Sequence, residues 1–146
     1  MIPENWRYSR GDIYYANMEP HVGSEQGGER PVVVLQNDAG NKHSPTIIIA
    51  TLTSRVDKKR HLPTHVLLDH NPGLKVPSIV QLEQIFTIDK RRVQRFAGQA
   101  SEEEMKQIET AIKISLGMSW EEENHIKQDN RRKQQTVTIE GCTGMK

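Results

Sequence analysis

The sequence predicts a fold of the α+β class that is mainly β: an antiparallel sheet that curls into a small barrel of five strands and is followed by C-terminal helices. Three observations predict it. Short β-branched segments separated by turn residues fill the first part of the chain, no crossover helix is predicted between them, and the first helical pattern begins at residue 89. Successive strands joined by loops favour an antiparallel sheet over a βαβ arrangement.

The strands are predicted from alternation and β-branched runs. Five are expected, over residues 12–18, 31–37, 45–53, 63–69 and 78–86. Turn residues 37–44 between the second and third strands predict a hairpin. Strict alternation in the last strand places Leu82, Gln84 and Phe86 on one face and Gln81 on the other.

Two helices are predicted after the strands. Residues 89–97 form a short candidate in which Val93 and Phe96 face the sheet. Ser101 and Glu104 then make a capping-box pattern, and Gly117 ends the helix. Apolar residues follow the box at helical spacing, at Met105, Ile108, Ile112 and Leu116.

The composition predicts one domain and a polar extension. The chain has 146 residues, of which 34% are hydrophobic and 27% charged. We expect an N-terminal arm at 1–9, a domain at 10–117, and a partly helical or disordered extension at 118–146, where too few apolar residues occur to hold a helix against the body.

Charge and cysteine content exclude several classes of protein. Lys and Arg number 20 against 19 Asp and Glu, so the chain has no overall basic field and any nucleic-acid site must be local. No apolar run approaches the roughly 18 residues of a membrane span, and the first ten residues lack a signal peptide's apolar region, so we expect a cytoplasmic protein with no membrane partner. The single cysteine, Cys142, allows no internal disulfide, and no cluster predicts a metal site.

The connection between the first two strands carries most of the functional information. Residues 19–30, EPHVGSEQGGER, are named the Gly-rich loop, and a hairpin would need only two to five residues there. Its glycines let a backbone approach a ligand closely beside hydrogen-bonding side chains. No Gly-Lys-Ser/Thr follows, so the loop is not a phosphate-binding loop of the nucleotide-hydrolase kind. A binding loop is favoured over a disordered one.

Six strings in order carry a family resemblance. They are RGDIYY from Arg10, GSEQGGERPVVV from Gly23, QND from Gln36, TLT from Thr51, LPTHV from Leu62 and LEQIFTIDK from Leu82. Together, over about residues 10–117, they resemble the MazF/PemK family of bacterial toxins. The resemblance implies an SH3-like barrel of the CcdB/PemK-like kind, a homodimer, no cofactor, and a metal-independent endoribonuclease that cuts single-stranded RNA at short sequences.

The resemblance also assigns catalytic residues. It puts the family's catalytic arginine at Arg30, where a planar guanidinium can hold two phosphate oxygens. Thr53 matches a second active-site residue, although Thr51 and Ser54 are neighbouring hydroxyls. Glu25 matches a loop acid that would accept a proton or orient Arg30, but an exposed carboxylate is a feeble base at neutral pH. From the residues alone, an ion pair of Arg30 with Glu25 or Glu29 is the competing use of this arginine.

RNA contacts are expected from the Gly-rich loop, the basic loop after Thr53, an aliphatic wall around Pro63, and one glutamine of the last strand. The residues are Ser24, Gln26, Arg55, Lys58, Lys59, Leu62, Pro63, His65 and Gln84. Classical metal-free ribonucleases use two histidines, and His21 and His65 are the two that merit testing here. The sequence does not assign the general acid or the general base.

Two other function classes compete with the ribonuclease. A gyrase poison of the CcdB type would share the barrel but lack the RNA site, and a noncatalytic SH3-like module would bind peptide or nucleic acid without chemistry. The Gly-rich loop with Glu25, Arg30 and Thr53 favours the ribonuclease. The resemblance further implies an antitoxin partner whose flexible C-terminal segment lies in the RNA groove.

Overall fold

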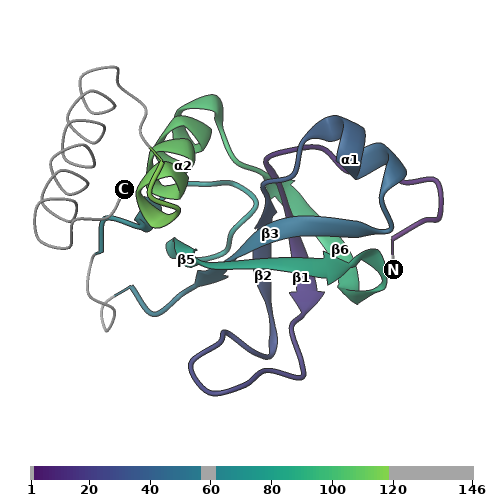
Figure 1. Ribbon diagram of the computed structural model, residues 1–146, viewed down its shortest axis with the longest axis horizontal. Coiled ribbons are helices and arrows are strands. Elements are labelled where there is room, and N and C mark those ends of the chain that lie inside the picture. Colours follow the sequence, from purple (N-terminus) through teal and green to yellow (C-terminus); the bar gives the residue numbers. More distant parts are fainter. Residues whose placement is uncertain (1, 57–61, 119–146) are drawn as a thin grey trace, which may run out of the picture.

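The fold is built on one sheet of six strands. Figure 1 shows the helices arranged around this sheet. The computed structural model describes residues 2–56 and 62–118; Lys58, Lys59 and the predicted extension beyond residue 118, with Cys142, lie outside them. The strands are β1 (Asp12–Asn17), β2 (Glu29–Val34), β3 (Thr46–Thr53), β4 (His65–Leu68), β5 (Ser78–Asp89) and β6 (Val93–Gln99). Their order is β4-β5-β3-β2-β1-β6, and every neighbouring pair is antiparallel. The mainly-β, antiparallel fold class is confirmed, with six strands instead of five.

The sixth strand replaces a predicted helix. Residues 89–97 were expected to be helical, but only Lys90–Arg92 form a single 3-10 turn, capped by the Asp89 side chain, and β6 follows at once. β6 pairs with β1, where Ala16 lies opposite Val93 and Tyr14 opposite Phe96. The helix prediction is wrong because β1 needs a partner for its second edge, and this long-range pairing outweighs a weak local helical pattern.

The connection between β2 and β3 is also different from the prediction. These strands do pair, but α1 (Asp38–His43) stands where a simple turn was expected. The Asn37 side chain caps it by accepting a hydrogen bond from the Gly40 amide at 2.8 Å. Buried Asn41 then donates to the Gln36 carbonyl at 2.9 Å. Asn and Asp favour turns and helix N-caps for the same reason, so the two outcomes look alike in sequence.

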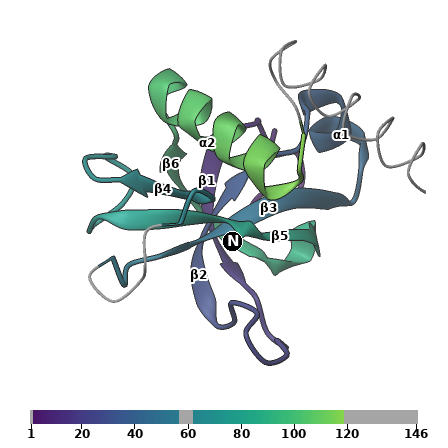
Figure 2. The same ribbon diagram turned by 60° about the vertical axis from the view of Figure 1, so that its left-hand side comes forward.

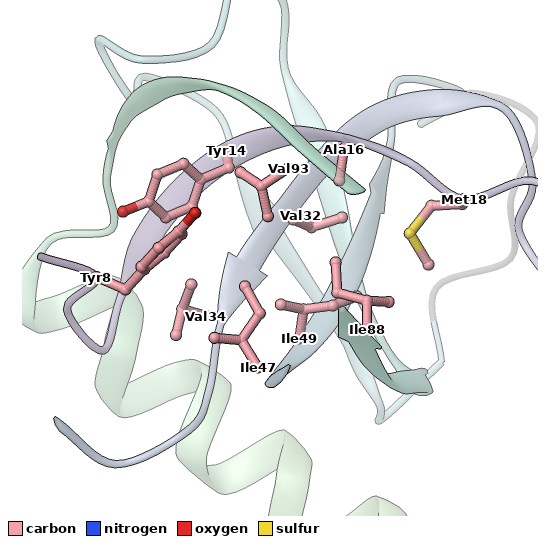
Figure 3. Packing of buried hydrophobic residues seen from close by; sticks show 10 residues of the cluster. All are labelled: Tyr8, Tyr14, Ala16, Met18, Val32, Val34, Ile47, Ile49, Ile88 and Val93. Atoms are coloured by element: carbon pink, nitrogen blue, oxygen red, sulfur yellow. The ribbon is translucent and has the colours of Figure 1, made fainter. Parts of the chain in front are cut away.

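The sheet buries side chains on both faces, which explains its uninterrupted apolar runs. On one face, alternate residues of β2 and β3 pack with tyrosines and Met18, as Figure 3 shows. The residues of this cluster are Tyr8, Tyr14, Ala16, Met18, Val32, Val34, Ile47, Ile49, Ile88 and Val93. The other face includes Val33, Ala50 and Leu52 and packs with Ile108 and Ala111 of α2 (Glu102–Ser115), the helix that lies across the sheet in Figure 2.

The last helix forms as predicted. The Ser101 hydroxyl accepts from the Glu104 amide at 3.1 Å, and the Glu104 carboxylate accepts from the Ser101 amide at 2.8 Å. Gly117, with a φ of 69°, ends it in the left-handed conformation that glycine adopts without strain. The capping box depends only on residues three apart, so a local signal was sufficient.

A large bulge interrupts β5. Ala50 of β3 lies opposite Ile85, but the next residue, Thr51, lies opposite Gln81. The prediction of strict alternation through this strand is therefore wrong: Leu82 packs in the cluster beneath α2, whereas Phe86 packs on the opposite face. The bulge releases Gln84 from the regular ladder and lets its side chain serve the site described next.

Candidate active site

The Gly-rich loop is held in one shape by a carboxylate at its base. Glu19 accepts hydrogen bonds from the Gly28 amide at 2.7 Å and the His21 amide at 3.2 Å, and it contacts His21 Nδ1 at 2.8 Å. These hydrogen bonds, that of His21 first, lower the pKa of Glu19. The Met18 amide also donates to the Gly28 carbonyl at 2.9 Å. The loop protrudes beyond the strand ends in Figure 1, but its backbone is tied at both ends.

Gln84 of β5 ties the middle of the loop to the sheet. Its Oε1 accepts from the Gln26 amide and its Nε2 donates to the Ser24 carbonyl, both at 3.3 Å. One side-chain amide thus satisfies two loop peptide groups. The loop is therefore anchored to a strand that is distant in sequence. That Gln84 also contacts RNA stays a prediction.

Arg30 occupies β2 immediately after the loop and is half-buried. Its Nε donates to the Gly27 carbonyl at 2.7 Å, and Nη1 donates to the Leu52 carbonyl at 3.2 Å. Within residues 2–56 and 62–118 it forms no ion pair: Glu25 accepts from the Val22 amide at 2.6 Å, and Glu29 from Gln94 at 2.8 Å. Burial, and then the charge of Arg55, lower the pKa of Arg30. The competing ion-pair interpretation is not what the structure contains.

Thr53 ends β3 beside Arg30, with 6% of its surface exposed. Its hydroxyl oxygen accepts from the Arg55 amide at 3.3 Å, which leaves the hydroxyl proton available to a ligand. Thr51 is fully buried, and its hydroxyl contacts the Gln81 side chain at 3.5 Å. Of the three neighbouring hydroxyls, Thr53 and Ser54 line a cleft.

Two adjoining clefts meet at Arg30, Thr53 and Arg55. The loop cleft, of about 280 Å³, is lined by His21, Glu25, Gln26, Gly27, Arg30, Thr53 and Arg55. The strand cleft, of about 420 Å³, is lined by the same three shared residues together with Tyr15, Glu29, Pro31, Leu52, Ser54, Leu74, Lys75, Val76 and Ser78. A guanidinium, a hydroxyl and a second arginine thus form the wall between two spaces. This arrangement suits a chain of phosphates that runs from one cleft to the other.

The remaining predicted residues fall into three groups. Glu25 and Gln26 line the loop cleft, and Arg55 lines both clefts. Leu62, Pro63 and His65 line neither cleft. His65 Nε2 contacts Glu83 at 2.9 Å with 5% of its side chain exposed, so a structural partner already occupies it. Ser24 also lines neither cleft and gives its carbonyl to Gln84.

Sequence reasoning missed the far wall of the strand cleft. Lys75 and Val76 follow the Asn71-Pro-Gly turn and carried no motif, and they line the cleft with Tyr15. The guanidinium of Arg95 lies 3.8 Å from the centre of the Tyr15 ring. The only sequence feature that indicated this wall was the loop that precedes β5, because loops between strands are common sites of ligand contact.

Among the residues that the structure describes, no group of three His, Cys, Asp or Glu side chains is placed to hold a metal ion. No helix in the same part of the chain is long and apolar enough to cross a membrane.

Sequence comparison identifies close relatives. Residues 9–116 match the protein family described as PemK-like, MazF-like toxin of type II toxin-antitoxin system. An Endoribonuclease MazF from Staphylococcus saprophyticus is 48% identical over 110 residues, which cover 75% of this chain and 91% of the relative.

Structure comparison gives the same result for the fold. MazF from Deinococcus radiodurans superposes with a TM-score of 0.69 at 25% identity, over 78% of this chain and 100% of that one. An endoribonuclease in complex with its cognate antitoxin from a mycobacterial species superposes with a TM-score of 0.66 at 24% identity, over 78% of this chain and 99% of that one.

Proposed function

This chain belongs to the PemK-like, MazF-like toxin family and is a toxin endoribonuclease, and we propose that it cuts single-stranded RNA at short defined sequences where its two clefts meet. One observation supports this placement above the others. The guanidinium of Arg30 is half-buried, has no carboxylate partner among the described residues, and lies beside the Thr53 hydroxyl. A partly desolvated cation with no carboxylate in direct contact is suited to a phosphate.

The chemistry uses the ribose 2′-hydroxyl as the nucleophile. Its oxygen forms a bond to phosphorus, its proton passes to a base, and the bond from phosphorus to the 5′-oxygen breaks as that oxygen gains a proton. The products are a 2′,3′-cyclic phosphate and a 5′-hydroxyl. Arg30 neutralises the charge that builds on the phosphorane oxygens, and Thr53 donates a hydrogen bond to one of them. Glu25, in the loop cleft, is the acceptor for the 2′-hydroxyl proton.

The substrate extends from the reacting phosphate into both clefts. Arg55 contacts the flanking phosphates, with Lys58 and Lys59 of the same loop, and Gln26 contacts a base edge. Ser24 and Gln84 act on RNA through the shape of the loop that they hold together. The exposed Leu62 and Pro63 contact bases farther along the strand, beyond the two clefts, and His65 acts on RNA through the shape of the segment that it holds together with Glu83. Because the proposed substrate is messenger RNA, we propose that the protein acts in the cytoplasm.

The partners follow from the relatives. Solved structures similar to this chain include an endoribonuclease in complex with its cognate antitoxin and a MazE-MazF assembly. We propose that an antitoxin inhibits this chain by laying an acidic segment over Arg30 and Arg55, and that the active form is a homodimer. The toxin domain comprises residues 10–117, with 1–9 as an arm and 118–146 as an extension.

The direct test is cleavage of RNA in EDTA. Wild-type protein is incubated with a long transcript, the cut ends are sequenced, and a short substrate is made with a 2′-deoxyribose on the 5′ side of the cut. We expect wild-type cleavage of the all-ribose substrate only, loss of about 10³-fold in rate for Arg30→Ala, and wild-type rates for Arg91→Ala.

The outcomes separate the three function classes. Cleavage of the 2′-deoxy substrate at the full rate would rule out attack by the 2′-hydroxyl. Absence of any RNA cleavage by the wild type would refute the nuclease, and inhibition of gyrase supercoiling would then support the CcdB type. Binding of RNA with neither activity would leave the noncatalytic module.

A further inference from the structure

The His21 imidazole is held in the loop cleft by a carboxylate on one side. Its Nδ1 contacts both oxygens of Glu19, at 2.8 and 2.9 Å. Its other ring nitrogen, Nε2, makes no hydrogen bond to any residue within 2–56 or 62–118. Because Nδ1 is occupied, Nε2 is the nitrogen that a ligand in the cleft can reach.

The His21 ring occupies space that is open only because residue 27 is a glycine. A Cβ on Gly27 would lie 2.0 Å from His21 Nδ1 and 2.5 Å from Cγ, so the imidazole fills that space. The Gly27 carbonyl is the group that accepts from Arg30 Nε at 2.7 Å. His21 and Arg30 are therefore positioned against the same glycine, which fixes a proton-carrying group next to the phosphate-binding group.

The chemistry of the cleft leaves one candidate proton donor. Of the side chains that line it, arginines do not give up protons, Thr53 is too weak an acid, and Glu25 is already assigned to accept the 2′-hydroxyl proton. Imidazole is the side chain that exchanges a proton near neutral pH. The charged groups facing His21 are two negative carboxylates and three positive guanidinium groups. They belong to Glu19 and Glu25, and to Arg30, Arg55 and Arg92.

We propose that His21 is the general acid of the cleavage and that Glu19 is its positioning residue; this inference rests on the proposed ribonuclease function. The imidazolium donates the Nε2 proton to the 5′-oxygen as the bond from phosphorus to that oxygen breaks, and the neutral ring regains a proton from water afterwards. The Glu19 carboxylate contacts Nδ1 and holds the ring in place, so that Nε2 is the reacting atom.

A substrate with a better leaving group tests this role. Replacing the bridging 5′-oxygen at the mapped cut with sulfur gives a thiolate that leaves without a proton. We expect His21→Gln to lower the single-turnover rate on ordinary RNA about 10²-fold and to cut the sulfur-bridged RNA at the wild-type rate. The alkaline limb of the wild-type pH profile should be absent in His21→Gln. His70→Gln is the matched control, because His70 also pairs with a carboxylate, Asp69, but is 93% exposed and lines neither cleft.

Glu19→Gln tests the positioning role separately. It should lower the single-turnover rate on ordinary RNA less than His21→Gln does and should cut the sulfur-bridged RNA at the wild-type rate, because only proton donation to the leaving oxygen depends on where Glu19 holds the ring. A purely structural role for Glu19 would lower the rates on both RNAs alike.

The failure of this inference is distinct from failure of the proposed function. If the wild type cuts RNA and His21→Gln cuts it equally fast, or if the loss persists on the sulfur-bridged RNA, His21 is not the general acid. If the wild type cuts no RNA, the nuclease itself is refuted.

Discussion

Arg30 and Arg91 place the same guanidinium in opposite settings. Arg30 is half-buried and held by two backbone carbonyls, and burial lowers its pKa. Arg91 is exposed and meets the Asp89 carboxylate through Nε at 3.0 Å and Nη2 at 3.2 Å, and this contact raises its pKa. Arg30 is partly desolvated and makes no ion pair within the described residues, with Glu19 as the one carboxylate whose charge reaches it, whereas Arg91 is paired with a carboxylate in water.

The contrast shows that density of basic residues is a poor guide to a phosphate site. The run Lys90–Arg92 is more basic than the sequence around Arg30, but protein groups use all three cations. Lys90 Nζ donates to the Asn41 carbonyl at 2.6 Å and lies over the Tyr8 ring, and Arg92 donates to the carbonyls of Asn17 and Glu19 at the base of the Gly-rich loop. Lys90 and Arg92, like Arg30, meet no carboxylate within the described residues, so what distinguishes Arg30 is its place beside Thr53 where the two clefts meet.

Exchanging each arginine for lysine should give the largest difference in activity between the two positions. Arg30→Lys keeps the charge but loses the fork that spans two phosphate oxygens, so we expect a fall of about 10²-fold in the single-turnover rate of RNA cleavage. Arg91→Lys should cut RNA as the wild type does. Thermal unfolding of both variants shows whether the loss has a structural cause. Equal rates for the two lysine variants would mean that the setting of Arg30 has no catalytic value.

Thr53 and Thr51 of β3 form a second contrasting pair, one at the clefts and one buried. Thr53→Val removes a hydroxyl from the wall shared by the clefts, and we expect about a 10-fold lower cleavage rate at nearly unchanged stability. Thr51→Val leaves the buried Gln81 oxygen without its hydroxyl partner and should lower the unfolding free energy by about 1 kcal/mol with a normal rate. Urea titration and cleavage kinetics measure the two effects. A loss of cleavage rate in Thr51→Val but not in Thr53→Val would assign the active hydroxyl to Thr51, two residues earlier on the strand.

Local chemistry in the sequence predicted the elements that depend on near neighbours. The capping box of Ser101 and Glu104, and the strand cores around Ile13 and Val33, follow from residues within one turn or one pleat. The strand at 93–99 was missed because its evidence is the unsatisfied edge of β1, far away in the chain. No local pattern can report such an edge.

In the candidate site, too, some features could be predicted from the sequence and others could not. The resemblance located Arg30, Thr53 and Glu25, but the isolation of Arg30 from carboxylates could not be predicted with Glu25 and Glu29 so near in sequence. Those acids turn to the Val22 amide and to Gln94. The role of Gln84 depends on a bulge in β5, which no alternation pattern showed.

Gln84→Ala should have a smaller effect on the same site. It removes the two hydrogen bonds that fix Ser24 and Gln26 and so loosens the loop whose Gly27 carbonyl holds Arg30. We expect RNA binding to weaken by about 1 kcal/mol, roughly fivefold, and the rate at saturating RNA to change less. Gln107→Ala, on the exposed surface of α2, is the control. A large loss at saturation with unchanged binding would indicate that Gln84 contacts the reacting group directly.

The smallest expected effect lies at Asp89 and depends on pH. Hydrogen bonds from the Arg91 side chain and amide lower the pKa of Asp89 below its ordinary 3.8. A lowered carboxylate pKa adds stability that is complete above the ordinary value and disappears as the pH falls through the lowered one. Asp89→Asn keeps the cap of the turn but not the charge, so its thermal midpoint should lie slightly below that of the wild type at pH 7, and the gap should close as the pH falls below 3.8 and through the lowered pKa. A gap that persists at low pH would show that the charge of Asp89 does not contribute to stability. The ion pair would then not distinguish Arg91 from Arg30.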